Sequence, residues 1–157
     1  MTKKVIVAGV GMIPFKKPGA SENYNVMGEK AARAALEDAG LDYKLVQQAY
    51  VGYVYGDSTA GQAALYGVGL SGIPIFNVNN YCSTGSSALF LARQAVQSGT
   101  IDCAIALGFE QMTPGALDIL FEDRPNPLMR FYDEMTSLQG FDESVPCLLY
   151  TSPSPRD

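Results

Sequence analysis

The sequence contains no histidine, few basic residues and no long hydrophobic run. Without an imidazole, any reaction that needs histidine for proton transfer must take that group from another region or subunit. Eleven Lys and Arg stand against sixteen Asp and Glu, a net charge of -5, which argues against the phosphate-binding surface of a nucleic-acid protein. No stretch reaches the roughly 18 consecutive apolar residues of a membrane span. We therefore expect neither a nucleic-acid partner nor a membrane span.

Cysteine is also scarce, with three residues at positions 82, 103 and 147. An odd number argues against a disulfide framework and favours a reducing compartment. The apolar run near the N-terminus is very short and indicates a strand, not a signal peptide. With 157 residues, 47% of them hydrophobic and 17% charged, the chain fits one globular domain or a piece of one.

Short apolar runs alternate with amphipathic segments, which predicts an α/β fold with a mostly parallel sheet covered on both faces. The pair Gly9 and Gly11 makes a poor dinucleotide fingerprint, because Pro14 falls where the helix should begin. Asp42 is expected to cap a short helical turn, and the chain beyond Met112 is expected to be loop-like. Strands are predicted over 5–10, 48–55, 75–78 and 103–109, and helices over 23–39, over 62–70 and up to residue 99.

Cys82 stands where a buried strand is expected to turn into a helix that opens with small polar residues, Ser-Thr-Gly. Backbone N–H groups at a helix start lack intrahelical acceptors and carry the positive end of the helix dipole, which favours a thiolate. The small residues leave room for a substrate, as at the nucleophile elbow of α/β hydrolases. Cys82 is the candidate nucleophile, and an inert buried cysteine is the alternative.

Other candidates have simpler explanations. Cys103 opens an apolar strand and is expected to belong to the core. Asn79 and Asn80 could turn the strand end or hold a carbonyl oxygen. Glu110 follows a strand on the side where open α/β sheets bind ligands, but a solvated or helix-capping carboxylate is the simpler interpretation.

The segment NVNNYCSTGSSALFLARQAVQSG, followed by CAIALGFEQM, resembles the nucleophile region of thiolases. The stretches GVGMIPFKKPGA, QAYVGYVYGDSTAGQ and LSGIPIFNVNN are similar to the sterol-carrier-protein type of that family. The resemblance runs from about Lys4 to Arg124. It implies a duplicated, layered α/β/α fold, of which this chain supplies the first βαβαβαββ half and the start of the loop domain.

The resemblance also implies a reaction, in which CoA cleaves a 3-ketoacyl-CoA to acyl-CoA and acetyl-CoA, or to propionyl-CoA from 2-methyl-branched substrates. Cys82 would attack the keto carbon and become an acyl-thioester. The family's histidine and second cysteine lie in its C-terminal half, and Cys103 does not match the latter, so this chain alone is expected to be inactive. CoA would be a substrate, with no permanently bound cofactor or metal, and the full-length protein would be a homodimer.

Two alternatives stay open, a ketoacyl-synthase-type condensing enzyme and a non-catalytic lipid or acyl-CoA binding protein. The location implied by the family is cytoplasmic if the source is bacterial and peroxisomal if it is eukaryotic. Residues 1–124 are expected to form the core half and residues 125–146 the beginning of the loop domain. The tail 147–157 (CLLYTSPSPRD) changes composition abruptly, and its reverse translation resembles the adapter DNA of a transposase-based sequencing library; a natural disordered tail is the alternative.

Overall fold

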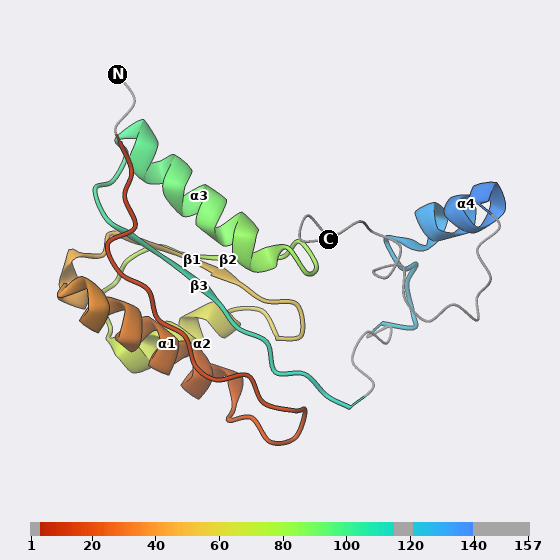
Figure 1. The fold of residues 1–157 in the computed structure, drawn as a ribbon, viewed down its shortest axis with the longest axis horizontal. Coiled ribbons are helices and arrows are strands. Elements are labelled where there is room, and N and C mark those ends of the chain that lie inside the picture. Colours follow the sequence, from red (N-terminus) through yellow and green to blue (C-terminus); the bar gives the residue numbers. More distant parts are fainter. Residues whose placement is uncertain (1–3, 115–120, 140–157) are drawn as a thin grey trace, which may run out of the picture. The chain divides into compact units, whose positions relative to one another are not determined.

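The structure is a computed structural model, and it describes residues 4–114 and 121–139. The chain divides into two compact units, Met1–Ala116 and Leu117–Asp157. The first unit is a parallel sheet with helices on both faces (Figure 1). Its elements, in chain order, are α1 (Tyr24–Ala39), a short 3-10 turn (Tyr43–Leu45), β1 (Gln48–Gly52), α2 (Ala60–Val68), β2 (Ile75–Val78), α3 (Thr84–Ser98) and β3 (Ala104–Gly108).

The sheet has the strand order β2-β1-β3, and both neighbouring pairs are parallel. The central strand β1 pairs through Ala49 with Ile75 on one side and with Ile105 on the other. Ala49 and Val51 are fully buried, as expected for a parallel strand covered on both faces. The predicted α/β class is therefore confirmed.

Two separate apolar clusters hold the layers together. Alternate residues of a strand point to opposite faces, so Ala49 and Val51 join the cluster under α1 and α2, while Tyr50 joins the cluster under α3. The cluster under α3 contains Ala88 and Ala92, whose small side chains allow close approach of the helix to the sheet. Figure 1 shows α3 on one side of the strands and α1 with α2 on the other.

The ends of α1 and of the turn that follows are fixed by specific groups. The first N–H of α1, at Tyr24, donates to the side-chain oxygen of Gln111 at 2.8 Å. Gly40 ends the helix at φ 63°, in the left-handed region that glycine adopts without strain. Asp42 accepts a hydrogen bond from the backbone N–H of Lys44 at 2.9 Å, which confirms the predicted cap.

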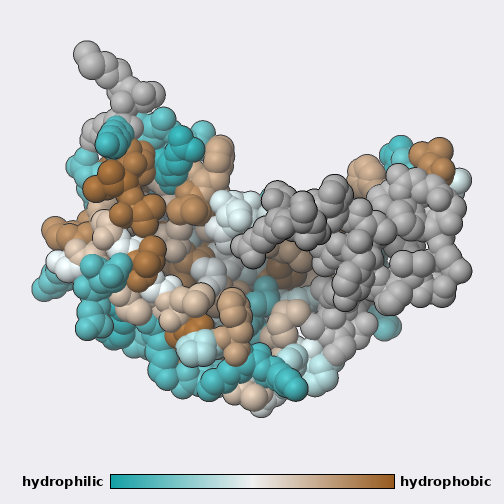
Figure 2. Space-filling model, in the orientation of Figure 1, coloured by the Kyte–Doolittle hydropathy of each residue, from teal (hydrophilic) through white to brown (hydrophobic). Residues whose placement is uncertain are grey.

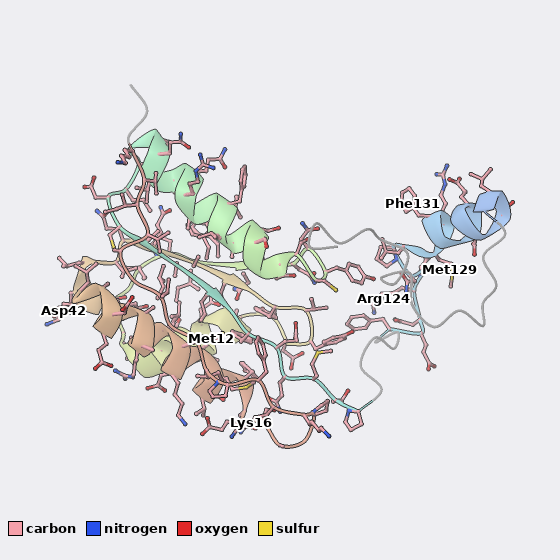
Figure 3. All side chains as sticks on the ribbon, viewed as in Figure 1. Met12, Lys16, Asp42, Arg124, Met129 and Phe131 are labelled. Carbon is pink, nitrogen blue, oxygen red and sulfur yellow. The ribbon has the colours of Figure 1, made fainter. Side chains whose placement is uncertain are left out.

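The predicted first strand over residues 5–10 is wrong. Residues 4–17 form no strand and pair with none of the three strands of the sheet, and this segment lies against α1 instead. A Cβ on Gly9 would stand 2.5 Å from the carbonyl oxygen of Ala35, and the Val10 N–H donates to Asp38 at 2.8 Å. Its apolar side chains form a hydrophobic surface (Figure 2), and Figure 3 labels one of them, Met12. The large hydrophobic residues exposed here are Ile6, Val7, Val10, Met12 and Phe15.

The expectation of a loop beyond Met112 is also wrong in one part, because Met129–Gln139 form α4 in the second unit. The boundaries expected at residues 124 and 146 stay predictions, and the tail 147–157 lies outside the described residues. Within residues 4–114 and 121–139, no helix is long and apolar enough to cross a membrane.

Candidate active site at the carboxyl ends of β1 and β2

The neighbouring strands β1 and β2 send the chain to opposite faces of the sheet. β1 leads into α2, which packs on the first cluster, and β2 leads into α3, which packs on the second. In open α/β sheets, ligands bind in the crevice that such a reversal creates at the carboxyl ends of the strands. A surface depression of about 170 Å³ lies at this point, lined by Tyr53, Val54, Gly56, Ser58, Asn77, Val78 and Asn79.

Cys82 lies in the tight turn that joins β2 to α3, three residues after Asn79, which lines this depression. Its side chain is exposed. Tyr81, the residue before it, has φ 48°, a left-handed conformation that is rare for a bulky residue. The turn is closed by two backbone hydrogen bonds, from the Ser83 N–H to the Asn80 carbonyl and from the Thr84 N–H to the Tyr81 carbonyl, each 3.1 Å long. The predicted strand-to-helix placement of Cys82 is therefore what the structure shows.

The side chain of Thr84 forms hydrogen bonds within the same turn. Its hydroxyl accepts a hydrogen bond from the backbone N–H of Asn80 at 3.2 Å and donates one to the carbonyl of Tyr81. Only 4% of Thr84 is exposed. A buried hydroxyl needs such partners, because burying an unpaired polar group costs free energy.

The start of α3 offers unpaired backbone donors. Among the described residues, nothing accepts a hydrogen bond from the N–H groups of Gly85 or Ser86. A Cβ added at Gly85 would meet no atom within 4 Å, so the space above the first turn is open, as the small residues predict. These N–H groups stand at the positive end of the helix dipole and can donate to an anion.

Two glycines at the ends of β1 and β3 let α3 come this close to the sheet. A Cβ on Gly52 would stand 2.6 Å from the carbonyl oxygen of Thr84, so no other residue fits there without displacing backbone. Gly108 faces Gly85, and a Cβ added to Gly108 would stand 3.6 Å from the Cα of Gly85. The first turn of α3 thus sits directly on the carboxyl edge of the sheet.

Both asparagines before Cys82 serve the turn. The Asn79 side-chain oxygen accepts from the Tyr81 N–H at 3.2 Å, and the Asn80 amide donates to the Ser87 hydroxyl at 2.9 Å. Of the two roles left open by the sequence, the structure shows the turn role for each.

Glu110 is neither a solvated nor a helix-capping carboxylate, so that interpretation is wrong. Its two oxygens accept hydrogen bonds from the backbone N–H groups of Val54 at 2.9 Å and Tyr55 at 2.8 Å. These donors follow β1, which ends at Gly52 and not at residue 55 as predicted. After Gly52 the backbone N–H groups bind the side chain of Glu110 in place of the backbone of a neighbouring strand. Glu110 thereby shapes the loop that lines one wall of the depression.

Asn77, which the sequence did not single out, ties the other wall to α2. Its side-chain oxygen accepts from the Gly61 N–H at 2.9 Å, and its amide donates to the Gln62 side chain at 2.7 Å. The sequence feature that could have indicated this role is the position of Asn77, a polar residue inside the otherwise apolar run Ile75–Val78.

Cys103 lies at the opposite end of the sheet from Cys82. It precedes β3 whereas Cys82 follows β2, and the strands are parallel. It is half-buried and packs against the first cluster, as expected of a core cysteine. Burial raises the pKa of its thiol above the usual range. Within the part of the chain that is described, no three His, Cys, Asp or Glu residues are grouped so that they could hold a metal ion.

The chain is a parallel α/β domain with an exposed cysteine on a strand-to-helix elbow. Residues 5–122 match the family described as "Thiolase, N-terminal domain". The chain belongs to the thiolase family through this domain.

Named relatives agree with this assignment. The chain is 52% identical to sterol carrier protein 2 of Gallus gallus over 142 residues, which are 89% of this chain and 26% of that protein. It is 37% identical to the benzoylsuccinyl-CoA thiolase subunit BbsB of Thauera aromatica over 115 residues, 72% of this chain and 29% of the relative. The chain thus spans about a quarter of the length of the curated relatives that it matches.

The fold is shared with a solved thiolase-family structure. Acetyl-CoA acetyltransferase from Syntrophomonas wolfei superposes with a TM-score of 0.60 at 24% identity, covering 66% of this chain and 28% of the other. At that level of identity the likeness concerns the fold alone.

Proposed function

We propose that this chain is the nucleophile-bearing part of a thiolase-type acyltransferase, with Cys82 as the nucleophile and CoA and a 3-ketoacyl-CoA as substrates. The observation that carries the proposal is the exposed Cys82 on an elbow at the carboxyl edge of the sheet, within a thiolase N-terminal domain. The proposed nucleophile has open space and unpaired N–H donors in the first turn of α3.

The chemistry consists of two acyl transfers. In the first, the Cys82 thiolate forms a bond to the keto carbon, the adjacent carbon–carbon bond breaks, and the departing acetyl-CoA unit takes a proton. In the second, the thiolate of free CoA attacks the acyl-thioester, acyl-CoA departs, and the Cys82 thiolate is restored. With 2-methyl-branched substrates the departing unit is propionyl-CoA.

The backbone donors have a role in both steps. Negative charge develops on the carbonyl oxygen when sulfur attacks, and preorganised N–H donors stabilise such an oxyanion. The N–H groups of Gly85 and Ser86, which have no acceptor among the described residues, are the groups we assign to this task or to holding the Cys82 thiolate.

The proton for the departing carbon must come from elsewhere, because the chain has no histidine and Cys103 lies at the opposite edge of the sheet. We therefore propose that this chain accepts an acyl group but does not complete a thiolysis cycle. Full turnover requires an acid and base from outside these residues.

The test is acylation of individual cysteines. The chain is incubated with acetyl-CoA and digested, and the acetyl group is located by peptide mass spectrometry. We expect the acetyl group on Cys82, and we expect Cys103→Ala to keep this modification while Cys82→Ala loses it. Acetylation of Cys103 in the wild type at the same rate, or none at Cys82 in a folded sample, would overturn the proposal.

The name of the chicken relative, sterol carrier protein 2, favours a second candidate, binding of a lipid or acyl-CoA without covalent transfer. The Cys82→Ala variant separates the two candidates. Equal affinity of wild type and Cys82→Ala for a fluorescent acyl-CoA, with no acylation of the wild type, would favour binding alone.

A further inference from the structure

We infer that Thr84 is a positioning residue for Cys82: its buried hydroxyl holds Tyr81 in the left-handed conformation that presents the cysteine at the start of α3. This inference rests on the proposed function for the role of Cys82. It concerns a residue two positions along the chain that the function itself does not require.

The conformation of Tyr81 needs an explanation in the structure. At φ 48° its Cβ crowds the backbone, and residues other than glycine, asparagine and aspartate rarely adopt this region. Such a conformation persists where the surroundings over-determine it, and it clusters at functional sites. The peptide that follows Tyr81 carries the N–H of Cys82, so the twist at Tyr81 sets the direction in which the chain enters α3.

The Thr84 hydroxyl bonds on both sides of this twist. It accepts from the N–H of Asn80 and donates to the carbonyl of Tyr81, so both hydrogen-bonding functions of the hydroxyl are used within the turn. The carbonyl of Tyr81 also accepts from the Thr84 backbone N–H at 3.1 Å. Rotation of Tyr81 out of the left-handed region would break these bonds and leave polar groups of a buried residue without partners.

Thr84 is itself held in place. Its backbone carbonyl and its methyl group both lie against Gly52 at the end of β1, where a Cβ would stand 2.6 Å and 2.7 Å from them. Among the serines and threonines of residues 4–114 and 121–139 whose burial is described, Thr84 is the one that is buried. With the methyl packed on the sheet and the hydroxyl in the turn, the sheet edge fixes the elbow through one side chain.

Two substitutions separate the hydroxyl from the rest of the side chain. Thr84→Val keeps the shape and removes both hydrogen bonds, whereas Thr84→Ser keeps the hydroxyl and removes the methyl group. The matched control is Ser98→Ala at the other end of α3, where the Ser98 hydroxyl donates to the Ala95 carbonyl at 2.9 Å. The readout is the rate of iodoacetamide alkylation at each cysteine, measured by peptide mass spectrometry near neutral pH, together with the thermal unfolding midpoint.

We expect Thr84→Val to slow alkylation of Cys82 by about threefold, because the cysteine leaves the positive end of the helix dipole. Cys103 serves as the internal standard and should keep its rate. Thr84→Ser should restore the wild-type rate at Cys82, and Ser98→Ala should leave both rates unchanged. A purely structural role would instead loosen the domain and raise the reactivity of the half-buried Cys103.

Three results would overturn the inference: an unchanged Cys82 rate in folded Thr84→Val, parallel changes at both cysteines, or no restoration by Thr84→Ser. If Thr84→Val fails to fold, it is measured on the background of Tyr81→Gly, since glycine adopts a positive φ without the hydrogen bonds of the Thr84 hydroxyl. There Thr84→Val should add little to the effect of Tyr81→Gly, and a full threefold loss would contradict the inference.

This test is independent of the acyl-transfer assay. Failure of acetyl-CoA to modify wild-type Cys82 would defeat the proposed function, but the alkylation rates would still decide whether Thr84 positions the cysteine. Conversely, acetylation of Cys82 at full rate in Thr84→Val would leave the proposed function standing and remove the role of Thr84.

Discussion

Gly52 and Thr84 are in contact so close that a Cβ on the glycine would stand 2.6 Å from the carbonyl oxygen of the threonine. This contact joins the end of the central strand to the first turn of α3, two residues after the candidate nucleophile. The position of the elbow is therefore set by the sheet.

Replacing Gly52 should destabilise the domain and disturb the elbow. Gly52→Ala must displace backbone atoms of Thr84, and overpacking of this kind costs about 1–3 kcal/mol of unfolding free energy. The matched control is Gly85→Ala, where an added Cβ meets nothing within 4 Å and alanine is the better helix former. Urea unfolding of both variants measures the difference, and equal stability of the two would contradict the packing shown by the structure.

Glu110 should be needed as a carboxylate with two accepting oxygens. Glu110→Gln keeps the shape but turns one acceptor into a donor that faces a backbone N–H, so we expect a loss of about 1–3 kcal/mol in unfolding free energy. The exposed Glu37 on α1 provides a control, since Glu37→Gln should change stability little. Equal urea midpoints for wild type and Glu110→Gln would show that the loop after β1 does not depend on the two hydrogen bonds that Glu110 accepts.

The two described cysteines should differ in their rates of alkylation near neutral pH. Burial raises the pKa of Cys103, so its thiolate fraction at any pH below that value is smaller than for an ordinary thiol, and its alkylation should accelerate only as the solution becomes alkaline. The exposed Cys82 is accessible to the reagent and should be modified first near neutral pH. Site-resolved alkylation profiles check this order, and faster modification of Cys103 near neutral pH would reverse it.

The 157-residue chain should accept acyl groups without turning over a 3-ketoacyl-CoA. Its histidine count is zero, and loss of one member of a cooperating catalytic set usually costs several orders of magnitude in rate. Chromatographic measurement of acetyl-CoA released from a 3-ketoacyl-CoA and free CoA tests this expectation. Steady release at an enzymatic rate, abolished in Cys82→Ala, would mean that residues within this chain supply the proton.

The sequence predicted the placement of Cys82 because the signal there is local. An apolar run ends, small polar residues follow, and an alanine-rich periodic segment begins, so the strand, turn and helix each leave their own pattern within about twenty residues. The parallel sheet followed from the alternation of such segments in the same way.

The errors concern partners that lie far apart along the chain. The run from Val5 to Val10 has the composition of a strand, but composition does not show which element it will contact, and here it lies against α1, where the Val10 N–H donates to Asp38, 28 residues away. Glu110 binds N–H groups 55 and 56 residues away. The hydrogen bonds of Thr84 within the elbow are a local feature, and the sequence does not predict them because it does not show that Tyr81 takes a positive φ.

The most direct test of Cys82 as an acyl carrier is a chase of acetylated protein with free CoA. The chain is acetylated with labelled acetyl-CoA, freed of excess reagent and mixed with unlabelled CoA, and the label is followed on Cys82 and in solution. The account predicts that the label leaves Cys82 and reappears as acetyl-CoA, faster than release by a small thiol at equal concentration. Label that stays on Cys82, or that both thiols release at equal rates, would contradict the claim that this elbow carries acyl groups to and from CoA.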